Sequence, residues 1–449
     1  MFKTLFNAWK VPELRKKILY TLLLLAIFRF GCVVTAPGVD VENLQLIMNY
    51  NQNSIMNTIN TITGGAFSSF SIFALSISPY ITASIVLQLL TFAIPALEEM
   101  SKEGENGRKR INQYTRYTAV VLSAIEAFGI YMMYRNTGIH FINAPLTPLV
   151  FIISLTCGST LLMWIAEQLS SKGIGNGTSM LIFAGIVSSL PSAVQYLYSI
   201  VLERGAVGGL IAAAVVLGAI LLIAGVVWVT EAERRIPIQY AKRVVGRKMY
   251  GGQSTHIPMK LSMAGVMPVI FAMSFMQLPA LILQWINNDI AMSSGFWAGV
   301  YKVFAFTSLN EGLTDAVTGA FNWDILAFGL LHILIYILLI VGFTFFYTMF
   351  MAFNPIEVSN NLKKNGGFIP GIRAGKPTAD YLTAVLTSIT GFGSVFLAII
   401  AVLPILTQFA GLQIGFGGTS ILIVVGVALE SVKQLESQML TRHYKGFLE

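Results

Sequence analysis

The chain has 449 residues, of which 55% are hydrophobic and only 11% are charged. Soluble domains carry about 25% charged residues, so this chain lacks the polar side chains needed to cover a water-exposed surface. Its net charge of +8 is compatible with nucleic-acid binding or with the positive loops of a membrane protein. The composition predicts a polytopic membrane protein and excludes disordered, collagenous and disulfide-rich classes.

Ten stretches are long and apolar enough to cross a membrane, which takes about 20 residues in a helix. In chain order they are residues 18–35, 72–95, 117–134, 147–166, 179–198, 208–229, 263–284, 325–352, 381–404 and 415–430. An even number of spans places both termini on the same side of the membrane. The sequence therefore predicts an all-α fold of ten transmembrane helices.

Residues 59–73, between the first two spans, are too short and too polar to cross the membrane. They contain Gly64, Gly65 and several Ser and Thr residues. Irregular backbone at membrane depth must be buried in protein or line a cavity. The segment is therefore either a re-entrant plug or an ordinary external loop.

The positive charges are concentrated on one side of the predicted topology. With the N-terminus in the cytoplasm, 25 of the 29 Lys and Arg residues fall in cytoplasmic segments. The positive-inside rule then predicts that both termini face the cytoplasm. Topology explains the charge, and nucleic acid remains a candidate partner only as ribosomal RNA that contacts the cytoplasmic loops.

Two of these cytoplasmic loops, residues 230–262 and 353–380, are long, basic and rich in turn residues. In the first loop, residues 236–241 alternate like a strand and residues 255–261 form a second candidate strand. Small-solute carriers seldom need two such platforms. The loops therefore favour docking sites for large partners over simple solvated loops.

The sequence contains an internal repeat with a period of five spans. The hexapeptide GTSMLI opens the fifth span at residues 177–182, and GTSILI opens the tenth at residues 418–423; Pro-x-Ile recurs at residues 79–81 and 268–270. Because five is odd, the second copy enters the membrane from the opposite side. This pattern indicates an inverted-topology repeat, whose interface houses the translocation path. We predict two five-helix halves, residues 1–200 and 201–449.

The motifs of an intramembrane hydrolase are absent from the sequence. There is no HExxH and no GxSxG, and the four histidines fall in separate loops and spans. Residues 371–376 resemble a phosphate-binding loop, but three residues separate the glycines where a Walker motif has four, and we expect no preceding strand. The chain is therefore predicted to be no enzyme, with no cofactor and no metal site.

The candidates for ionisable groups deep in the predicted spans are Arg29, Glu126 and His332. A proton- or sodium-coupled transporter needs ionisable groups deep in the membrane, and a single acid is too few for a relay. Glu126 is expected to be a polar contact between helices. A secondary small-solute transporter remains the alternative function, although no ion site is visible at the repeat interface.

The most specific motifs of the chain lie in the cytoplasmic loops. Residues 233–243 are ERRIPIQYAKR, residues 253–260 are QSTHIPMK, and residues 367–373 are GFIPGIR. The sequences GIGNG at residues 173–177 and GGTS at residues 417–420 extend the pattern. These motifs occur in order over essentially the whole chain and resemble those of the SecY/Sec61-alpha family, the central subunit of the protein-conducting channel.

The resemblance implies a clamshell of two halves, hinged between spans five and six, with an hourglass pore between them. The channel would translocate unfolded secretory polypeptides and release transmembrane segments sideways through a lateral gate. The pore would narrow at a mostly aliphatic ring of Ile77, Ile81, Thr178, Ile182, Ile270 and Ile423. Four of these, Ile81, Ile182, Ile270 and Ile423, also belong to the repeated motifs. Thr178 departs from the aliphatic residue that is usual at its position.

The resemblance also implies a plug and a gate. The plug would be a re-entrant helix near residues 59–73 that includes Thr61, Gly64, Gly65, Ala66, Phe67 and Ser68. The lateral gate would lie between spans two and three on one side and spans seven and eight on the other, and would include Thr82, Gln88 and Leu278. Gln88 is expected to form a hydrogen bond across the closed gate.

The expected docking residues are basic and lie in the two cytoplasmic loops. Arg373 occupies the tip of the loop 353–380, where the adjacent Ala374 replaces the usual proline. In the loop 230–262 the expected docking residues are Lys242, Arg243, Arg247 and Lys248. The implied partners are the SecA motor ATPase, the ribosome, the SecE and SecG subunits, substrates with signal sequences, and membrane lipids. The implied location is the bacterial cytoplasmic membrane, with several passes through it.

Overall fold

The structure is a computed structural model that describes residues 2–39, 60, 63–135, 146–240, 243–245, 248–250, 254–286, 295–305, 323–409 and 418–445. The first part of the chain forms α1 (Phe2–Lys10), α2 (Pro12–Gly31), α5 (Ser78–Ala93), α6 (Pro95–Lys102), α7 (Glu105–Arg135), α8 (Thr147–Lys172) and α9 (Gly177–Ser188). The second part forms α10 (Leu190–Glu231), α11 (Met267–Ile286), α12 (Phe296–Ala305), α13 (Trp323–Tyr347), the π-helix η2 (Thr348–Ala352), α14 (Pro355–Lys364), α15 (Lys376–Phe409) and α16 (Gly418–Lys445).

Each of the ten predicted spans coincides with a helix of this bundle. They fall on α2, α5, α7, α8, α9 with the start of α10, the rest of α10, α11, α13, α15 and α16. By length and hydropathy alone, four helical stretches of the described residues could cross a membrane, and a fifth if α5 and α6, bent by 100°, count as one. Large apolar side chains such as Leu23, Leu210 and Leu334 are exposed on the bundle surface, as helices that face lipid require.

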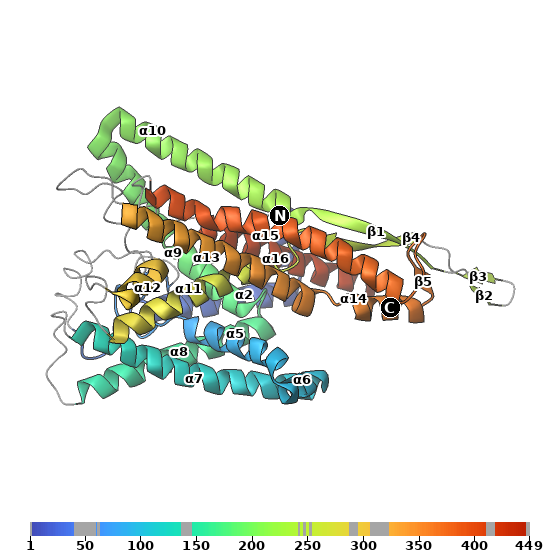
Figure 1. The fold of residues 1–449 in the computed structure, drawn as a ribbon, viewed down its shortest axis with the longest axis horizontal. Coiled ribbons are helices and arrows are strands. Elements are labelled where there is room, and N and C mark those ends of the chain that lie inside the picture. The colour runs from blue at the N-terminus through green and yellow to red at the C-terminus, as the bar shows by residue number, and fades with distance from the viewer. Residues whose placement is uncertain are drawn as a thin grey trace.

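The fifth and sixth predicted spans are joined by a bend rather than by a loop. α10 bends at Gly205, whose φ of 54° lies in the left-handed region, a conformation that glycine adopts without a Cβ clash. The boundary predicted at residue 200 falls within α10, shortly before this bend, and the division into two halves stays a prediction. Figure 1 shows α5, α7 and α8 together on one side of the bundle and α10, α15 and α16 on the other.

The repeated motifs occupy equivalent positions in paired helices. The motifs GTSMLI and GTSILI open α9 at Gly177 and α16 at Gly418. Pro79 and Pro268 both lie in the first turn of their helices, α5 and α11, where proline is well tolerated. α9 packs against α16, and α5 packs against α11. The internal repeat therefore brings related helices into contact.

The two basic loops meet in one small sheet. β1 (Glu233–Tyr240) pairs antiparallel with β4 (Ser254–Lys260), with Ile236 opposite Ile257, and β5 (Gly367–Phe368) from the second loop pairs with the other edge of β1. β2 (Arg243–Val245) and β3 (Lys248–Tyr250) form a separate hairpin. Both predicted strands of the loop 230–262 are confirmed. We call the end of the bundle that carries these strands the strand end (Figure 1).

Candidate functional site

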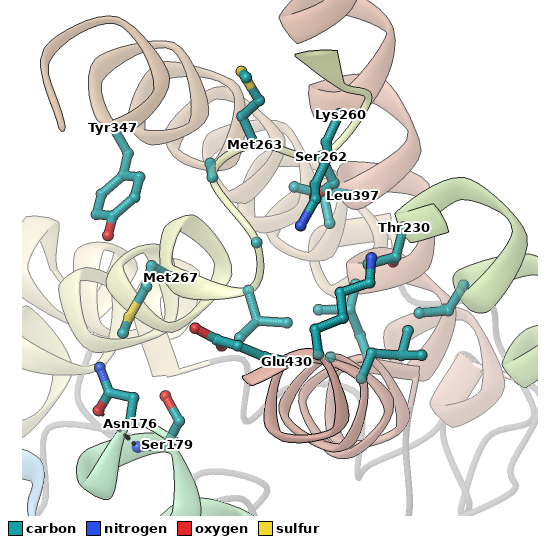
Figure 2. Close-up of a pocket in the computed structure, with 18 of the residues that line it drawn as sticks. Asn176, Ser179, Thr230, Lys260, Ser262, Met263, Met267, Tyr347, Leu397 and Glu430 are labelled. Carbon is teal, nitrogen blue, oxygen red and sulfur yellow. Dashed lines mark hydrogen bonds between the residues drawn. The ribbon is translucent and has the colours of Figure 1, made fainter. Parts of the chain in front are cut away.

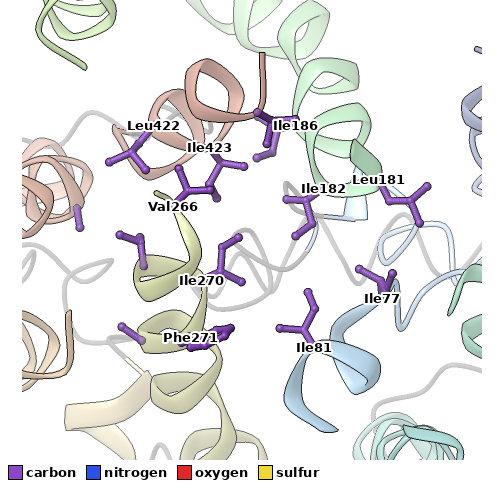
Figure 3. Packing of buried hydrophobic residues seen from close by; sticks show 14 of the residues in the cluster. Ile77, Ile81, Leu181, Ile182, Ile186, Val266, Ile270, Phe271, Leu422 and Ile423 are labelled. Atoms are coloured by element: carbon purple, nitrogen blue, oxygen red, sulfur yellow. The ribbon is translucent and has the colours of Figure 1, made fainter. Parts of the chain in front are cut away.

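Five isoleucines from the two parts of the chain meet in one buried cluster. Figure 3 shows the side chains of Ile81 on α5, Ile182 on α9, Ile270 on α11 and Ile423 on α16 pointing toward one another. Ile77, just before α5, belongs to the same cluster, and the exposed fractions of the five range from 1% to 9%. Because these side chains are almost inaccessible to water, the contact they form is closed in this structure.

Local sequence fixes the helices that carry these isoleucines. The Asn176 side chain accepts hydrogen bonds from the backbone N–H groups of Thr178 and Ser179 at 3.0 and 3.4 Å, which caps the start of α9. A Cβ at Gly426 would lie 2.6 Å from Val266 Cγ1, so glycine lets α16 approach the start of α11 closely. These contacts set the positions of Ile182, Ile270 and Ile423.

Thr178, the sixth predicted ring residue, is polar and therefore does not count among the hydrophobic side chains of this cluster. It is half-buried in the first turn of α9, one turn before Ile182. We call the five isoleucines the ring, and both its role as the constriction of a pore and the membership of Thr178 stay predictions.

A cavity of about 260 Å³ lies next to the ring, toward the strand end (Figure 2). Its lining includes Ser179 and Val266, about one turn before Ile182 and Ile270, and Gly426, about one turn after Ile423. It also includes Lys260 at the end of β4. The cavity therefore leads from the base of the sheet to the ring.

The mouth of this cavity is charged. Lys260, Glu430 and Lys433 line it, and Lys433 Nζ lies 2.8 Å from the Glu231 carboxylate. Burial, and then repulsion from the Lys433 ammonium, lower the pKa of Lys260. Opposite charges thus alternate at the entrance, whereas the ring one turn further in carries none.

The predicted plug segment packs on the other side of the ring. A Cβ at Gly64 would lie 2.6 Å from Ser188 Oγ and 2.9 Å from Gly185 Cα, about one to two turns beyond Ile182 on α9. Ala66 is fully buried in the same cluster as the isoleucines. Along α9 the order is therefore cavity, ring and plug segment.

The backbone of this segment differs from the predicted helix over most of its described residues. Residues 64–70 are turns, and φ is positive at Gly64, Gly65 and Phe70, at 66°, 89° and 41°. Gly65 and Ser68 are half-buried, Phe67 is buried, and Thr61 lies outside the described residues. Small residues and left-handed turns let the segment fold compactly without a continuous helix.

The predicted gate residues lie on helices that face each other. Thr82 is buried on α5, Leu278 is half-buried on α11, and α11 packs against both α5 and α7. The Phe92 ring contacts Phe346 and Phe350, with centroids 5.2 and 4.9 Å apart, so α5 also touches α13 and η2. The hydropathy pattern of the sequence does not predict these aromatic contacts.

The hydrogen bond expected across the gate from Gln88 is not formed to any residue that the structure describes. Gln88 Nε2 instead donates to Ser84 Oγ at 3.1 Å on the same helix, and Gln88 Oε1 is buried without a partner among the described residues. Residues four apart share one helix face, so Ser84 lies within reach of Gln88 on α5 itself. The i, i+4 spacing of these two residues was the sequence signal that could have shown this.

Arg373 is exposed, as a docking residue must be. Its loop is held by Thr378 Oγ1, which donates to the Arg373 carbonyl at 2.8 Å, and by Ser359 Oγ, which donates to the Gly375 carbonyl at 2.7 Å. The fold thus positions the backbone and leaves the guanidinium able to reach outward. Arg243 and Lys248 lie in β2 and β3, and Lys242 and Arg247 lie outside the described residues.

The expectation of no strand before residues 371–376 is wrong. β5 ends three residues before Gly371, and α15 begins at Lys376. β5 is only two residues long and belongs to an antiparallel sheet, and the glycine spacing still differs from that of a Walker motif. Among the described residues, no group of three or more His, Cys, Asp or Glu side chains could hold a metal ion.

The ionisable residues of the spans have separate environments. His332 Nδ1 lies 2.7 Å from the Val303 carbonyl oxygen, which joins α13 to α12. Glu126 is buried on α7, and its role as a contact between helices stays a prediction. Arg29 Nη1 donates to the Gly64 carbonyl at 2.7 Å, so this residue belongs with the plug segment.

Comparison with known proteins identifies the family. A family model described as SecY matches residues 71–432. The protein translocase subunits SecY of Streptomyces scabiei and Halalkalibacterium halodurans are 42% and 41% identical to this chain, each over 100% of both chains. A solved protein-conducting channel has a TM-score of 0.65 at 20% identity, and Sec61 in a canine ribosome–channel complex has a TM-score of 0.62 at 19% identity; each match covers 95% of this chain and 92% of the other. The chain belongs to the SecY family.

Proposed function

We propose that this chain is a protein-conducting channel that moves unfolded secretory polypeptides across a membrane. The observation that carries the proposal is the ring of five isoleucines, drawn from both parts of the chain, with a cavity on one side and the plug segment on the other. A polypeptide presents side chains of every kind, so the narrowest point must bind none of them strongly. Aliphatic side chains meet this need, and a hydrophobic constriction also limits ion flow by dewetting.

The plug segment closes the resting channel and moves aside for a substrate. Its close fit against Gly185 and Ser188 supports a closed state, and its turn-rich backbone supports displacement as a unit. We propose the plug as Thr61, Gly64, Gly65, Ala66, Phe67 and Ser68, and the ring as Ile77, Ile81, Ile182, Ile270 and Ile423 with Thr178 at its edge.

Transmembrane segments leave sideways between α5 with α7 and α11 with α13. Thr82, Gln88 and Leu278 line this gate in the proposal. The contacts of Phe92 with Phe346 and Phe350 are apolar and exchangeable. An apolar signal helix can therefore replace them at little net cost, since it offers the gate similar surface and gains lipid contact.

The strand end faces the cytoplasm and receives the partners. The excess of Lys and Arg in its loops supports this orientation, with both termini cytoplasmic and the chain in the bacterial cytoplasmic membrane. Exposed Arg373, together with Lys242, Arg243, Arg247 and Lys248, would contact the SecA motor and the ribosome. SecE and SecG complete the complex. The chain itself supplies the path, and the motor or the ribosome supplies the driving force.

Reconstitution tests the proposal. The chain, with the subunits that co-purify with it, is inserted into vesicles and given SecA, ATP and an unfolded secretory protein. We expect the substrate to become protected from added protease only when the chain and SecA are both present. Absence of protection with folded chain in the vesicles would contradict the proposal, and accumulation of a small solute driven by an ion gradient would favour a carrier.

A further inference from the structure

The plug segment is held in two different ways along its length. Its base, residues 70–77, is joined to the segment that follows α2 by a β-bridge: the Ala36 N–H donates to the Phe70 carbonyl at 2.8 Å, and the Ile72 N–H donates to the Val34 carbonyl at 2.9 Å. A Cβ at Gly158 would collide with the Ile72 carbonyl, so the base also lies tight against α8. Backbone pairing and close packing therefore fix the base.

The tip, residues 63–69, forms few hydrogen bonds to the bundle, although its Ala66 and Phe67 side chains are buried in apolar clusters. Most of its hydrogen bonds lie within the tip and Asn60, such as those of Thr63 Oγ1 with the Asn60 carbonyl and of the Ser68 N–H with the Asn60 side chain. From α2 and the residue after it, Arg29 Nη1 donates to the Gly64 carbonyl at 2.7 Å, and Cys32 Sγ lies 3.9 Å from the Thr63 carbonyl oxygen. A thiol is a weak donor, so Arg29 provides the strong contact.

The position of Arg29 cannot be explained by its helix alone. It lies in the last turn of α2, where a cation is favourable, and a long side chain near a helix end commonly extends to the membrane surface. Here the side chain is half-buried, and among the described residues no acidic group forms an ion pair with it. Its charge is instead directed at a backbone carbonyl of the tip.

The backbone conformation of Gly64 and its lack of a side chain permit this contact. Its φ of 66° is one that residues with a side chain rarely adopt, and a Cβ there would lie 2.6 Å from Arg29 Nη1. The same Cβ would also meet Ser188 Oγ and Gly185 Cα on α9. The absent side chain therefore lets the carbonyl of Gly64 reach the guanidinium while the tip sits against α9.

We propose that Arg29 is the latch of the plug: its guanidinium holds the tip in the closed position through the Gly64 carbonyl. This inference rests on the proposed channel function and adds a positioning residue to it. The bond is charge-assisted and therefore strong for its length, yet it is single and lies where water enters once the tip leaves. The displaced state then costs little, because water can solvate the freed guanidinium, and the latch is reversible.

Cys32 provides a direct readout of the tip, independent of transport. It is 3% exposed and lies under the tip, and the sequence contains one other cysteine, Cys157. In a Cys157→Ala background, a water-soluble maleimide added on the plug side labels Cys32 only when the tip moves away. Resting ion leak through reconstituted vesicles without substrate reports the same event by a second route.

The variants are Arg29→Met, which removes the donor and the charge, and Arg29→Lys, which keeps both with a shorter reach. Gly64→Ala leaves Arg29 intact but displaces the tip, and Arg204→Met removes an exposed arginine at the bend of α10 as a control. We expect about tenfold faster Cys32 labelling and about tenfold higher leak for Arg29→Met, a change of about 1.4 kcal/mol in the closed state. Gly64→Ala should match it, Arg29→Lys should lie between it and the parent, and Arg204→Met should equal the parent.

A purely structural role for Arg29 gives a different pattern. It predicts that Arg29→Met lowers protein yield and substrate transport together, with no selective rise in leak and no rescue by lysine, and that outcome would overturn the latch. If Arg29→Met does not fold, unchanged labelling in both Arg29→Lys and Gly64→Ala would overturn it equally. If the parent transports normally and Cys32 labelling is slow in all variants, the latch proposal is wrong and the channel proposal stands. If the parent does not transport the substrate, the channel proposal is wrong. Cys32 labelling still tests the latch in that case, because it does not depend on transport.

Discussion

The isoleucine ring and the basic loops at the strand end lie on opposite sides of the same cavity but are built from different residues. The ring side chains are apolar and at most 9% exposed, and they come from four helices and the turn before one of them. The loops present Arg373 and other cations to solvent, and their sheet is anchored by buried Ile236 and Met259. In the proposed function the ring lets any polypeptide pass, which agrees with its lack of polar groups. The proposed docking of a partner at the loops agrees with exposed charge on a backbone held by hydrogen bonds.

The largest effect that separates the two regions is expected from Arg373→Glu. Disrupting a close interfacial charge pair costs about 2–5 kcal/mol, which is about 30-fold or more in affinity. We expect motor-driven transport to fall by at least that factor, while membrane insertion of the chain and its resting leak stay unchanged. The measurement is SecA-dependent transport and SecA binding in vesicles.

The matched control is Lys364→Glu, a charge reversal at an exposed residue of α14 in the same loop. We expect it to change transport by no more than a few-fold. Equal losses in the two variants would mean that overall loop charge, rather than the Arg373 contact, binds the partner.

Two nearby residues on α16 allow the ring to be compared with ordinary core packing. Ile421 and Ile423 are 3% and 2% exposed, but only Ile423 belongs to the ring cluster. Replacing either with serine should destabilise the fold by a similar amount, about 2–4 kcal/mol. We expect Ile423→Ser alone to raise resting ion leak, by about tenfold, because it places a hydroxyl in the constriction. Comparable leak in Ile421→Ser would show that general loosening of the bundle, and not the ring, controls the seal.

The smallest effect is expected at the proposed gate. Gln88 Oε1 is buried without a partner in the part of the chain that the structure describes, and such an acceptor costs about 1–3 kcal/mol. Gln88→Leu removes this cost from the closed gate, and at the low end of that range, about 1 kcal/mol, export of substrates with defective signal sequences should fall about fivefold. A rise in that export would instead support the hydrogen bond across the gate that the sequence suggested.

The sequence was sufficient for features that depend on local pattern. Each stretch selected by hydropathy falls on a helix, alternation located the two strands of the first loop, and the repeated motifs selected four of the five isoleucines that share one buried cluster. The length of an apolar stretch and the alternation of a strand are properties of contiguous residues, and a repeated motif can be recognised directly in the amino-acid sequence. A membrane requires long apolar helices, so hydropathy identifies such helices from the sequence alone.

The features that escaped prediction depend on residues far apart in the chain or on backbone geometry. β5 is two residues long and is defined only by its pairing with β1 from the other loop. The bend at Gly205 has no polar loop to mark it. Arg29 looked like a candidate for ion coupling, since nothing in its neighbourhood in sequence points to a carbonyl 35 positions later.

Site-specific crosslinking of a stalled substrate tests the central claim most directly. A photoreactive amino acid is placed at Ile270 in the ring or, as a control, at Ile282 on the same helix, which is 47% exposed on the bundle surface. A secretory protein is then stalled during transport by a folded domain at its C-terminus. We expect the stalled chain to crosslink strongly at position 270 and weakly at position 282. No crosslink at position 270 in vesicles that transport the substrate would show that the polypeptide takes another route and would contradict the ring as the pore.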